Sequence, residues 1–101
     1  MIIRYEEYKD YAAIRAVNES AFETPAEANL VEVIRVEAQP IISLVAQDGE
    51  AIVGHVLFSP ASLTGHPDLK IMGLGPVAVL PHLQRRGIGT ALINAGMDKC
   101  K

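Results

Sequence analysis

The chain has 101 residues, of which 50% are apolar and 21% are charged, so we expect one small folded domain over residues 1–101 rather than a disordered segment. The net charge of −3 argues against a nucleic-acid-binding protein driven by bulk charge. The uncharged runs over residues 51–67 and 71–84 each contain two prolines and are too short to cross a bilayer. No apolar secretory signal opens the chain, and a single cysteine excludes a disulfide framework, so we expect a cytoplasmic protein without membrane or nucleic-acid partners.

A short strand and a helix are predicted at the N-terminus. Residues 2–5 form a β-rich run, and from Lys9 to Phe22 apolar residues recur at helical spacing. The expected apolar stripe of this helix consists of Ala12, Ala13, Ala16, Val17 and Ala21, with Ile14 beside it.

A second helix is predicted to begin at residues 24–27. Their sequence, Thr-Pro-Ala-Glu, combines an N-cap threonine, a proline at the first helical position and a glutamate at the third, which together make a capping box. Pro40 marks the expected end of the helix. Its predicted buried stripe is Leu30, Val31 and Ile34, with Ala38 as a further candidate.

The pattern then changes to strands. Residues 42–47 alternate as a strand does, Asp48-Gly49 is a hairpin turn signal, and the second arm runs from Ala51 to Ser59. Residues 60–67 are expected to be a connection, followed by a strand from Lys70 to Leu80. A last helix is predicted from Gly87 to Lys101, with Leu92, Ile93 and Met97 on one face. This order predicts an α+β or mixed α/β fold around one sheet.

The junction between that last strand and the last helix has the features of a phosphate site. The first turn of the helix contains Gly87 and Gly89, where an anion can approach unpaired backbone N–H groups without meeting a Cβ. Arg85 and Arg86 add positive charge, while Gln84 and Thr90 add neutral donors. The alternative for the two glycines is close packing of the helix on the sheet, with no ligand.

Charge is divided unevenly along the chain. Residues 1–50 carry four basic and ten acidic side chains, a balance of −6, whereas residues 51–101 carry five basic and two acidic ones, a balance of +3. The second half therefore favours an anionic ligand and the first half a cationic one.

One stretch resembles a known family. Gln84-x-x-Gly87-x-Gly89, following Val77-Ala78-Val79 and Pro81, resembles the Q/R-x-x-G-x-G/A acyl-CoA motif of the GNAT superfamily, the Gcn5-related N-acetyltransferases. The order of elements extends the resemblance over essentially the whole chain. It is nearest to small bacterial predicted N-acetyltransferases with a segment that here reads Phe22-Glu23, Ala26-Glu27 and Leu30-Val31.

The resemblance implies a GNAT-like acyl-CoA N-acyltransferase fold with acetyl-CoA as cosubstrate and no metal. The pantetheine arm would lie beside the strand, with the acetyl carbonyl near the backbone N–H of Val79. A deprotonated amine, from a small molecule, a protein N-terminus or a lysine, would attack the thioester directly. The residues expected to bind the cosubstrate are Val77, Ala78, Val79, Gln84, Arg85, Arg86, Gly87, Ile88, Gly89, Thr90 and Ala91.

The chain departs from the family pattern after the motif helix. A complete fold of this kind continues with further strands and a helix, whereas this chain ends at Lys101, so the resemblance implies a truncated fold. The tyrosine that often protonates the leaving thiolate lies in that part, and no general acid is assigned here. The strand over residues 70–80 would be left as an apolar edge, and we expect a second copy of the chain to cover it in a homodimer.

Other candidates keep two interpretations. Glu27 is a possible acceptor of the amine's proton, or simply the third residue of the capping box. Glu23, His55 and His82 are possible proton carriers or ordinary structural residues. Three function classes remain open: an N-acetyltransferase, a non-catalytic acyl-CoA-binding module, and an inactive oligomerising remnant of the fold.

Overall fold

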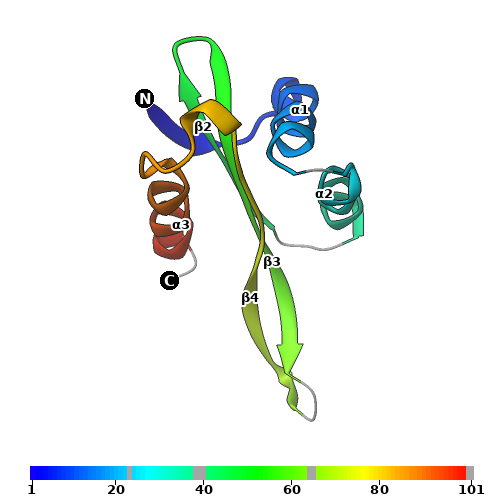
Figure 1. Cartoon of the computed structure of the whole chain (residues 1–101). Helices are drawn as coiled ribbons and strands as arrows, with labels where there is room; N and C mark the ends of the chain where they lie inside the picture. Colours follow the sequence, from blue (N-terminus) through cyan, green and yellow to red (C-terminus); the bar gives the residue numbers. More distant parts are fainter. Residues whose placement is uncertain (23, 38–40, 64–65, 100–101) are drawn as a thin grey trace.

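Four strands, three α-helices and two short 3-10 helices make up the part of the chain that the computed structural model describes, residues 1–22, 24–37, 41–63 and 66–99 (Figure 1). In chain order they are β1 (Ile2–Tyr5), η1 (Tyr8–Asp10), α1 (Tyr11–Ala21), α2 (Ala26–Glu37), β2 (Ile42–Asp48), β3 (Ala51–Leu63), β4 (His66–Val79), η2 (Pro81–Leu83) and α3 (Ile88–Lys99).

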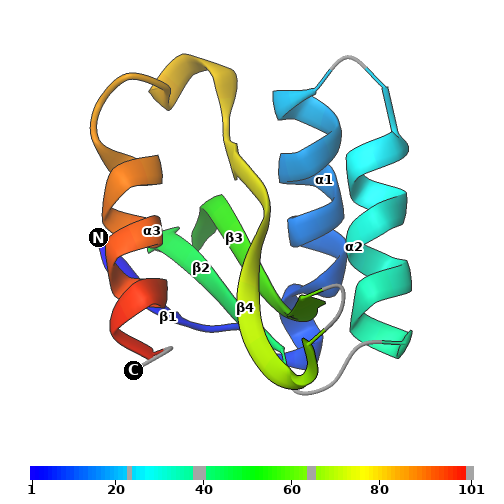
Figure 2. The same cartoon turned by 90° about the horizontal axis from the view of Figure 1, so that it is seen from below.

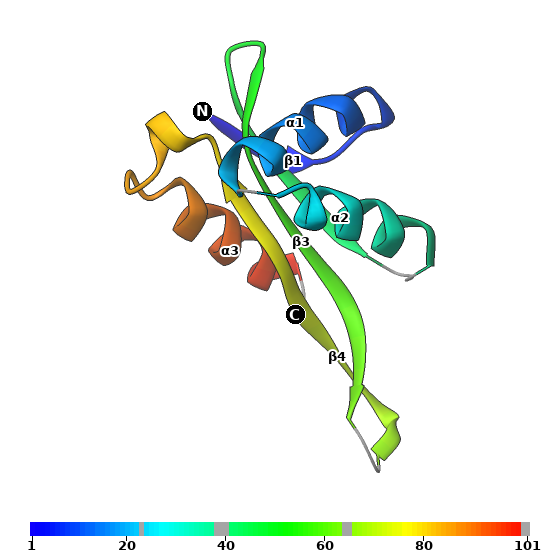
Figure 3. The ribbon, with the colours of Figure 1, turned by 45° about the vertical axis from the view of Figure 1, so that its right-hand side comes forward.

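The four strands form one antiparallel sheet in the order β1-β2-β3-β4. Helices α1 and α2 lie on one face of this sheet and α3 lies on the other, as Figure 2 shows. The far part of the β3–β4 hairpin extends beyond these layers (Figures 1 and 3). The predicted mixed α/β class is confirmed, and among the described strands β4 forms one edge of the sheet.

Helices on both faces explain the burial of β2. Residues 43–46 are all buried, because α3 covers one set of alternating side chains and α1 and α2 cover the other. Alternate side chains of this strand therefore point to two different buried faces, and neither face of the strand is exposed to solvent there.

The predicted connection over residues 60–67 is wrong. β3 continues to Leu63 and β4 begins at His66, with Pro60 paired to Met72 and Ser62 to Lys70; residues 64 and 65 lie outside the described residues. A proline is tolerated there because β2 stops pairing with β3 at Phe58, so the far part of β3 has a single neighbour.

Two of the helix stripes also need correction. In α1 the buried residues are Ile14, Val17 and Asn18, while Ala12 and Ala16 are exposed. In α2 Leu30 is exposed, whereas Ala28 and Val31 are buried. Burying a large side chain removes more apolar area from water than burying an alanine does, so the isoleucine decides how α1 is turned. Ala38 lies outside the described residues.

Helix α3 differs from its prediction in the same way. Leu92 is buried and Ile93 is half-buried, but Met97 is 55% exposed and Gly96 takes the place against the sheet. A Cβ on Gly96 would overlap the ring of Phe58 on β3, so the glycine allows the helix to lie close to the strand. The face toward the sheet therefore consists of Ile88, Leu92 and Gly96, one residue per turn.

The core has two parts, one on each face. On the α3 face the cluster contains Leu44, Ala46, Val53, Val56, Phe58, Val79, Ile88 and Leu92. On the α1–α2 face it contains Ile14, Val31, Val45 and Leu57. None of the helices within the described ranges is long and apolar enough to span a membrane.

Candidate functional site

The motif residues follow the end of β4 as a compact turn. After η2 the chain passes through Gln84 to Arg85, which has a φ of 65°, and then to Gly87, with a φ of 84°. The side-chain Nε2 of Gln84 donates a hydrogen bond of 3.0 Å to the carbonyl oxygen of Val79. The turn is therefore tied back to the strand that precedes it.

The turn leads into the N-terminus of α3. The first backbone bond of this helix runs from the N–H of Ala91 to the carbonyl of Gly87, at 3.0 Å. The N–H groups of Ile88, Gly89 and Thr90 come before that bond and so lack an acceptor within the helix. The positive end of the helix dipole lies at the same place.

The side chains around this helix end divide between solvent and core. Arg85, Arg86, Thr90 and Ala91 are exposed, while Ile88 is buried in the α3-face cluster and offers only its backbone. Both arginines therefore stand next to the free donors, where they add positive charge without losing hydration to the core.

Packing does not require glycine at the two motif positions. A Cβ on Gly87 would meet nothing within 4 Å, and one on Gly89 would lie 3.7 Å from Cγ1 of Val77, an ordinary contact. The tight positions are elsewhere, at Gly96 and at Gly54, whose Cβ would lie 3.0 Å from Cδ1 of Leu92. The packing alternative for the motif glycines thus loses its support, although the positive φ still favours glycine at position 87.

The backbone of β4 presents some of its polar groups to the open edge. The N–H of Leu80 donates to the carbonyl of Val53 at 3.0 Å, and Val79 is paired in register with Gly54. Since hydrogen-bonded and non-bonded pairs alternate along an antiparallel ladder, the N–H and C=O of Val79 face away from β3, as do those of Val77. Ala78 directs its own groups to His55 on β3.

Glu27 lies in the first turn of α2, the helix on the face of the sheet opposite α3. It is half-buried, and its Oε2 is a buried atom without a hydrogen-bond partner among the described residues. The hydroxyl of Thr24 accepts a bond of 3.3 Å from the N–H of Ala26, one residue before the N–H of Glu27 that a capping box uses, so this bond is not the threonine half of the predicted capping box. Figures 2 and 3 show the end of α1, just before α2, beside the last part of β4. Glu23 lies outside the described residues.

His55 belongs to a buried polar chain made of Asn18, His55, Ser43, Glu6 and Arg35. Asn18 Nδ2 donates to the carbonyl of Ile14 at 3.0 Å and faces His55 Nδ1 at 3.4 Å, which leaves Nδ1 as the acceptor and puts the ring proton on Nε2. His55 Nε2 lies 2.8 Å from Ser43 Oγ, and that hydroxyl donates to Glu6 Oε1 at 2.7 Å. Arg35 closes the chain with an ion pair of 2.8 Å to Glu6.

Burial lowers the pKa of His55 to about 4, so its imidazole is neutral at pH 7. Asn18 and His55 are both 0% exposed, and Asn18 Oδ1 has no partner among the described residues. No local pattern predicted this polar chain, because its members are far apart in the sequence: Glu6 and His55 are separated by 49 positions. His82, by contrast, lies exposed in η2.

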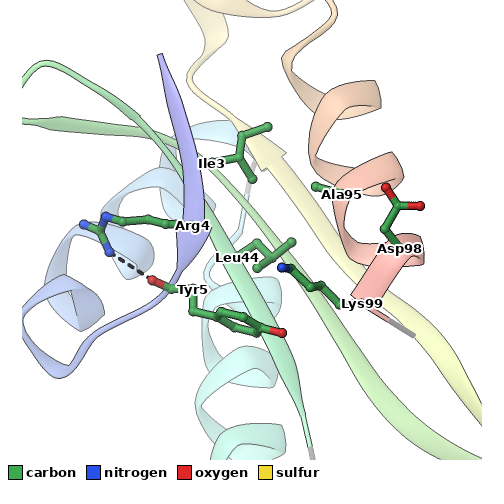
Figure 4. A pocket seen from close by; sticks show the side chains of 7 residues that line it. All are labelled: Ile3, Arg4, Tyr5, Leu44, Ala95, Asp98 and Lys99. Carbon is green, nitrogen blue, oxygen red and sulfur yellow. Dashed lines mark hydrogen bonds between the residues drawn. The ribbon is translucent and has the colours of Figure 1, made fainter. Parts of the chain in front are cut away.

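A cavity of about 320 Å³ opens at the other end of α3, away from the motif (Figure 4). In it Lys99 Nζ lies 5.3 Å from the ring centre of Tyr5. Its lining residues are Ile3, Arg4, Tyr5, Leu44, Ala95, Asp98 and Lys99, none of which belongs to the predicted site. Within the described ranges no cluster of three potential metal ligands is found.

The fold and this strand–turn–helix site together define a mixed α/β domain with an open helix N-terminus beside two arginines, and comparison with known proteins gives its family. The acetyltransferase (GNAT) family matches residues 5–101, so the chain belongs to that family. Among curated Escherichia coli K12 proteins, the uncharacterised N-acetyltransferase YhbS is 36% identical over 97% of this chain and 59% of its own length. YjhQ, with the same description, is 38% identical over 88% of this chain and 51% of its own.

Solved structures agree with this assignment. A GNAT family acetyltransferase from Brucella melitensis, in complex with acetyl-CoA, matches with a TM-score of 0.90 and 38% identity, over 98% of this chain and 67% of that one. Escherichia coli YhbS in complex with CoA matches with a TM-score of 0.88 and 34% identity, over 98% of this chain and 55% of that one. The predicted GNAT-like fold is confirmed, and the chain spans little more than half the length of the curated relatives it matches.

Proposed function

We propose that this chain provides the acetyl-CoA site of an N-acetyltransferase that moves an acetyl group from acetyl-CoA to a primary amine. The observation that carries the proposal is the junction of β4 and α3, where free helix N–H groups, two exposed arginines and an outward-facing strand edge adjoin. The crystallised relatives support it, because the Brucella protein was solved with acetyl-CoA and YhbS with CoA.

The diphosphate of acetyl-CoA would lie at the start of α3. The unpaired N–H groups of Ile88, Gly89 and Thr90 and the charges of Arg85 and Arg86 suit two adjacent phosphates. The N–H of Ala91 already donates to the carbonyl of Gly87, so it is not counted among these donors. Gly87 and Gly89 leave the backbone open to a group of that size, and packing places no competing demand on them. The residues present therefore fit the cosubstrate.

The pantetheine arm and the thioester would lie along the edge of β4. Its amide groups can pair with outward-facing backbone groups along this edge as a further strand would. The N–H of Val79 is then the donor for the acetyl carbonyl and for the oxyanion that forms on it. This donor needs no side chain, so its position depends on the strand alone.

The reaction would be a direct transfer. The nitrogen lone pair of the amine forms a C–N bond to the thioester carbon, the C–S bond breaks, and its electron pair leaves on the CoA sulfur. The amine gives up one proton and the thiolate takes up one, which yields the N-acetyl product and free CoA. Glu27 is the proposed proton acceptor, supported by its buried and unpartnered Oε2; its alternative role is in the capping box. The holding of both reactants in place supplies much of the remaining rate.

A non-catalytic acyl-CoA-binding module is the second candidate. It is favoured by the positions of the tyrosines, since Tyr5, Tyr8 and Tyr11 all lie in β1, η1 or the first turn of α1, and none adjoins α3's N-terminal end. Both candidates predict cosubstrate binding, and only turnover with a panel of amines separates them.

The first experiment is thermal unfolding at increasing acetyl-CoA concentration. At about 100 times Kd, a ligand that binds only the folded state adds roughly 2.7 kcal/mol, which for a domain of this size raises the Tm by on the order of 10 °C. Pantetheine, which lacks the diphosphate, serves as the control ligand and should give a much smaller rise. A flat response up to millimolar acetyl-CoA would contradict the proposal and favour the inactive remnant.

Replacing Gly89 by valine tests the role of the motif glycine. We expect Gly89→Val to abolish the acetyl-CoA-dependent rise in Tm by steric exclusion, while the unliganded Tm stays near that of the wild type. Asn94→Val, on an exposed position of the same helix, is the matched control and should keep the response. A Gly89→Val protein that unfolds, or one that binds normally, would show that the residue has another role.

The expected homodimer remains a prediction. The cosubstrate would occupy only the last part of the β4 edge, so a second copy could pair with the rest of this 14-residue strand. Light scattering at high concentration, with and without acetyl-CoA, tests it, and a monodisperse monomer would count against it.

A further inference from the structure

We propose that the cavity at the C-terminal end of α3 is a binding site for a small carboxylate with an apolar body, the class to which arylalkanoic acids and medium-chain fatty acids belong. The cavity is separate from the proposed acetyl-CoA site, because the motif turn lies at the opposite end of α3 (Figure 1). The ligand class follows from an apolar hollow and from one cation that lies over it, Lys99.

The cavity exists because α3 does not cover the whole width of the sheet. The helix chiefly contacts β2, β3 and β4, whereas β1 is the edge strand beyond them. Tyr5 on β1 stands directly opposite Leu44 on β2, so both side chains belong to the α3 face. Leu44 is 1% exposed and Tyr5 is 51% exposed, so the cover that the helix provides ends between these two strands. This leaves a hollow beside the end of the helix.

The hollow suits the apolar part of a small molecule. Its volume of about 320 Å³ is that of a small-molecule site, and such sites are mostly apolar with a few polar groups at fixed positions. Ile3, Leu44 and Ala95 supply the apolar lining, and Ile3 and Ala95 are only half-buried. A ligand placed there removes this apolar surface from water and gives it packing partners.

Lys99 supplies the charge that selects an anion. Figure 4 shows its amine over Leu44 and beside the ring of Tyr5, 5.3 Å from the ring centre, while the carboxylate of Asp98 points away from both. Within the described part of the chain Lys99 forms no ion pair. Arg4, the other cation of the lining, is already held by Asp10 at 2.8 Å. The ammonium of Lys99 is therefore the group that a carboxylate in the hollow would meet.

Two other interpretations of the same residues make different predictions. A lysine in the last turn of a helix interacts favourably with the negative end of the helix dipole, which would explain its charge without any ligand. That negative end, together with Asp98, would instead favour a cationic ligand. The position of the Lys99 amine over the apolar hollow favours the carboxylate, because such a ligand gains an ion pair and apolar contact together.

Three probes with the same phenylpropyl body test the charge selection. NMR titration of the whole chain with 3-phenylpropionate, 3-phenylpropionamide and 3-phenylpropylamine compares an anion, a neutral amide and a cation. We expect 3-phenylpropionate to bind with a Kd of about 1 mM or below, and roughly three- to tenfold more tightly than the amide. The amine should bind most weakly. The backbone signals that move most should be those of Ile3, Leu44 and Ala95.

Two variants separate the charge from the hollow. Lys99→Met keeps an apolar stem and removes the charge, so its affinity for 3-phenylpropionate should fall to that for the amide, which should not change. Lys9→Met, at an exposed lysine of η1 outside the lining, is the matched control and should keep the preference for the anion. Ala95→Leu fills the hollow and should abolish binding of all three probes, whereas Asn94→Leu, at the exposed position before it, should keep binding.

Each outcome supports or overturns the proposal. A preference for the anion that Lys99→Met removes and Lys9→Met keeps supports it. Equal affinities for the three probes, tightest binding of the amine, no binding, or signals that move at another surface overturn it. Thermal unfolding of each variant shows whether a loss of binding is a loss of fold, and if Ala95→Leu unfolds, the probe comparison and Lys99→Met decide alone. Because these titrations use no acetyl-CoA, their result is independent of the proposed function.

Discussion

The two faces of the sheet are held by different kinds of contact. The α3 face is apolar and depends on shape, with Gly54 and Gly96 allowing the helix to lie close to β3. The α1–α2 face contains the buried polar chain from Asn18 to Arg35, in which each donor has a specific acceptor. Shape fixes how near a helix lies, whereas directional hydrogen bonds fix which atoms face one another.

This difference matters for the site because each face positions a different part of it. Close packing of α3 sets the height of its N-terminus over the end of β4, and with it the place of the free N–H groups. The polar chain joins α1 and α2 to β2 and β3, and so sets how α2, which carries Glu27, lies on the sheet. We expect added side-chain volume on the α3 face to destabilise the protein, and acidification to destabilise it through the α1–α2 face.

Acidification should give the largest effect, through His55 on the α1–α2 face. Its pKa is about 4 in the folded protein against an ordinary 6.5, so the stability this neutral ring contributes is present above pH 6.5 and is lost as the pH falls toward 4. The total loss is about 3 kcal/mol, from 1.36 kcal/mol per pKa unit. Denaturant unfolding between pH 7 and 4 measures it.

His55→Gln is the control for this loss, because an amide can replace the donor to Ser43 and does not titrate. Its stability should change less between pH 6.5 and 4 than that of the wild type. Asp10, whose pKa is lowered by its hydrogen bond from Arg4, loses its contribution only below its usual value of 3.8, and so acts at lower pH. Equal pH profiles for the two proteins would show that the buried ring is not the source.

Added volume at Gly96 should give the next largest effect, on the α3 face. A methyl group there overlaps the Phe58 ring, so Gly96→Ala should lower the free energy of unfolding by about 2 kcal/mol, as overpacking commonly does. Gly89→Ala is the matched control in the same helix. Its new Cβ would meet Val77 at an ordinary 3.7 Å, so stability should stay the same or rise by up to about 1 kcal/mol. A stable Gly96→Ala protein would mean that the ring moves aside without cost.

An exposed ion pair between α1 and α2 should give the smallest effect. Arg15 on α1 pairs with Glu32 on α2 at 3.0 Å and with Glu19 at 3.6 Å, and all three side chains are accessible to water. Arg15→Ala should cost less than about 1 kcal/mol, and 1 M salt should remove most of the difference. A loss as large as that from acidification would mean that the exposed pair, and not the buried chain, holds the two helices together.

The order of elements and the motif were predictable because they depend on local patterns. Apolar periodicity, the Asp48-Gly49 turn and the proline-flanked glycines each involve residues within a few positions of one another. The length of the β3–β4 hairpin was not predictable in this way. Pro60 and Pro67 signal a connection, and whether a proline can remain in a strand depends on which edge has a neighbour.

The sequence by itself determined that the chain is a mixed α/β domain of the GNAT family, with a phosphate-type turn after its last strand. It did so because backbone conformation and motif spacing are properties of short segments. Only the tertiary structure decided that Gln84 reaches Val79, that Gly96 rather than Met97 faces the sheet, and that His55 lies in a buried polar chain. Each of these depends on the direction in which a side chain points once distant segments have packed together, and that direction is set by the whole fold.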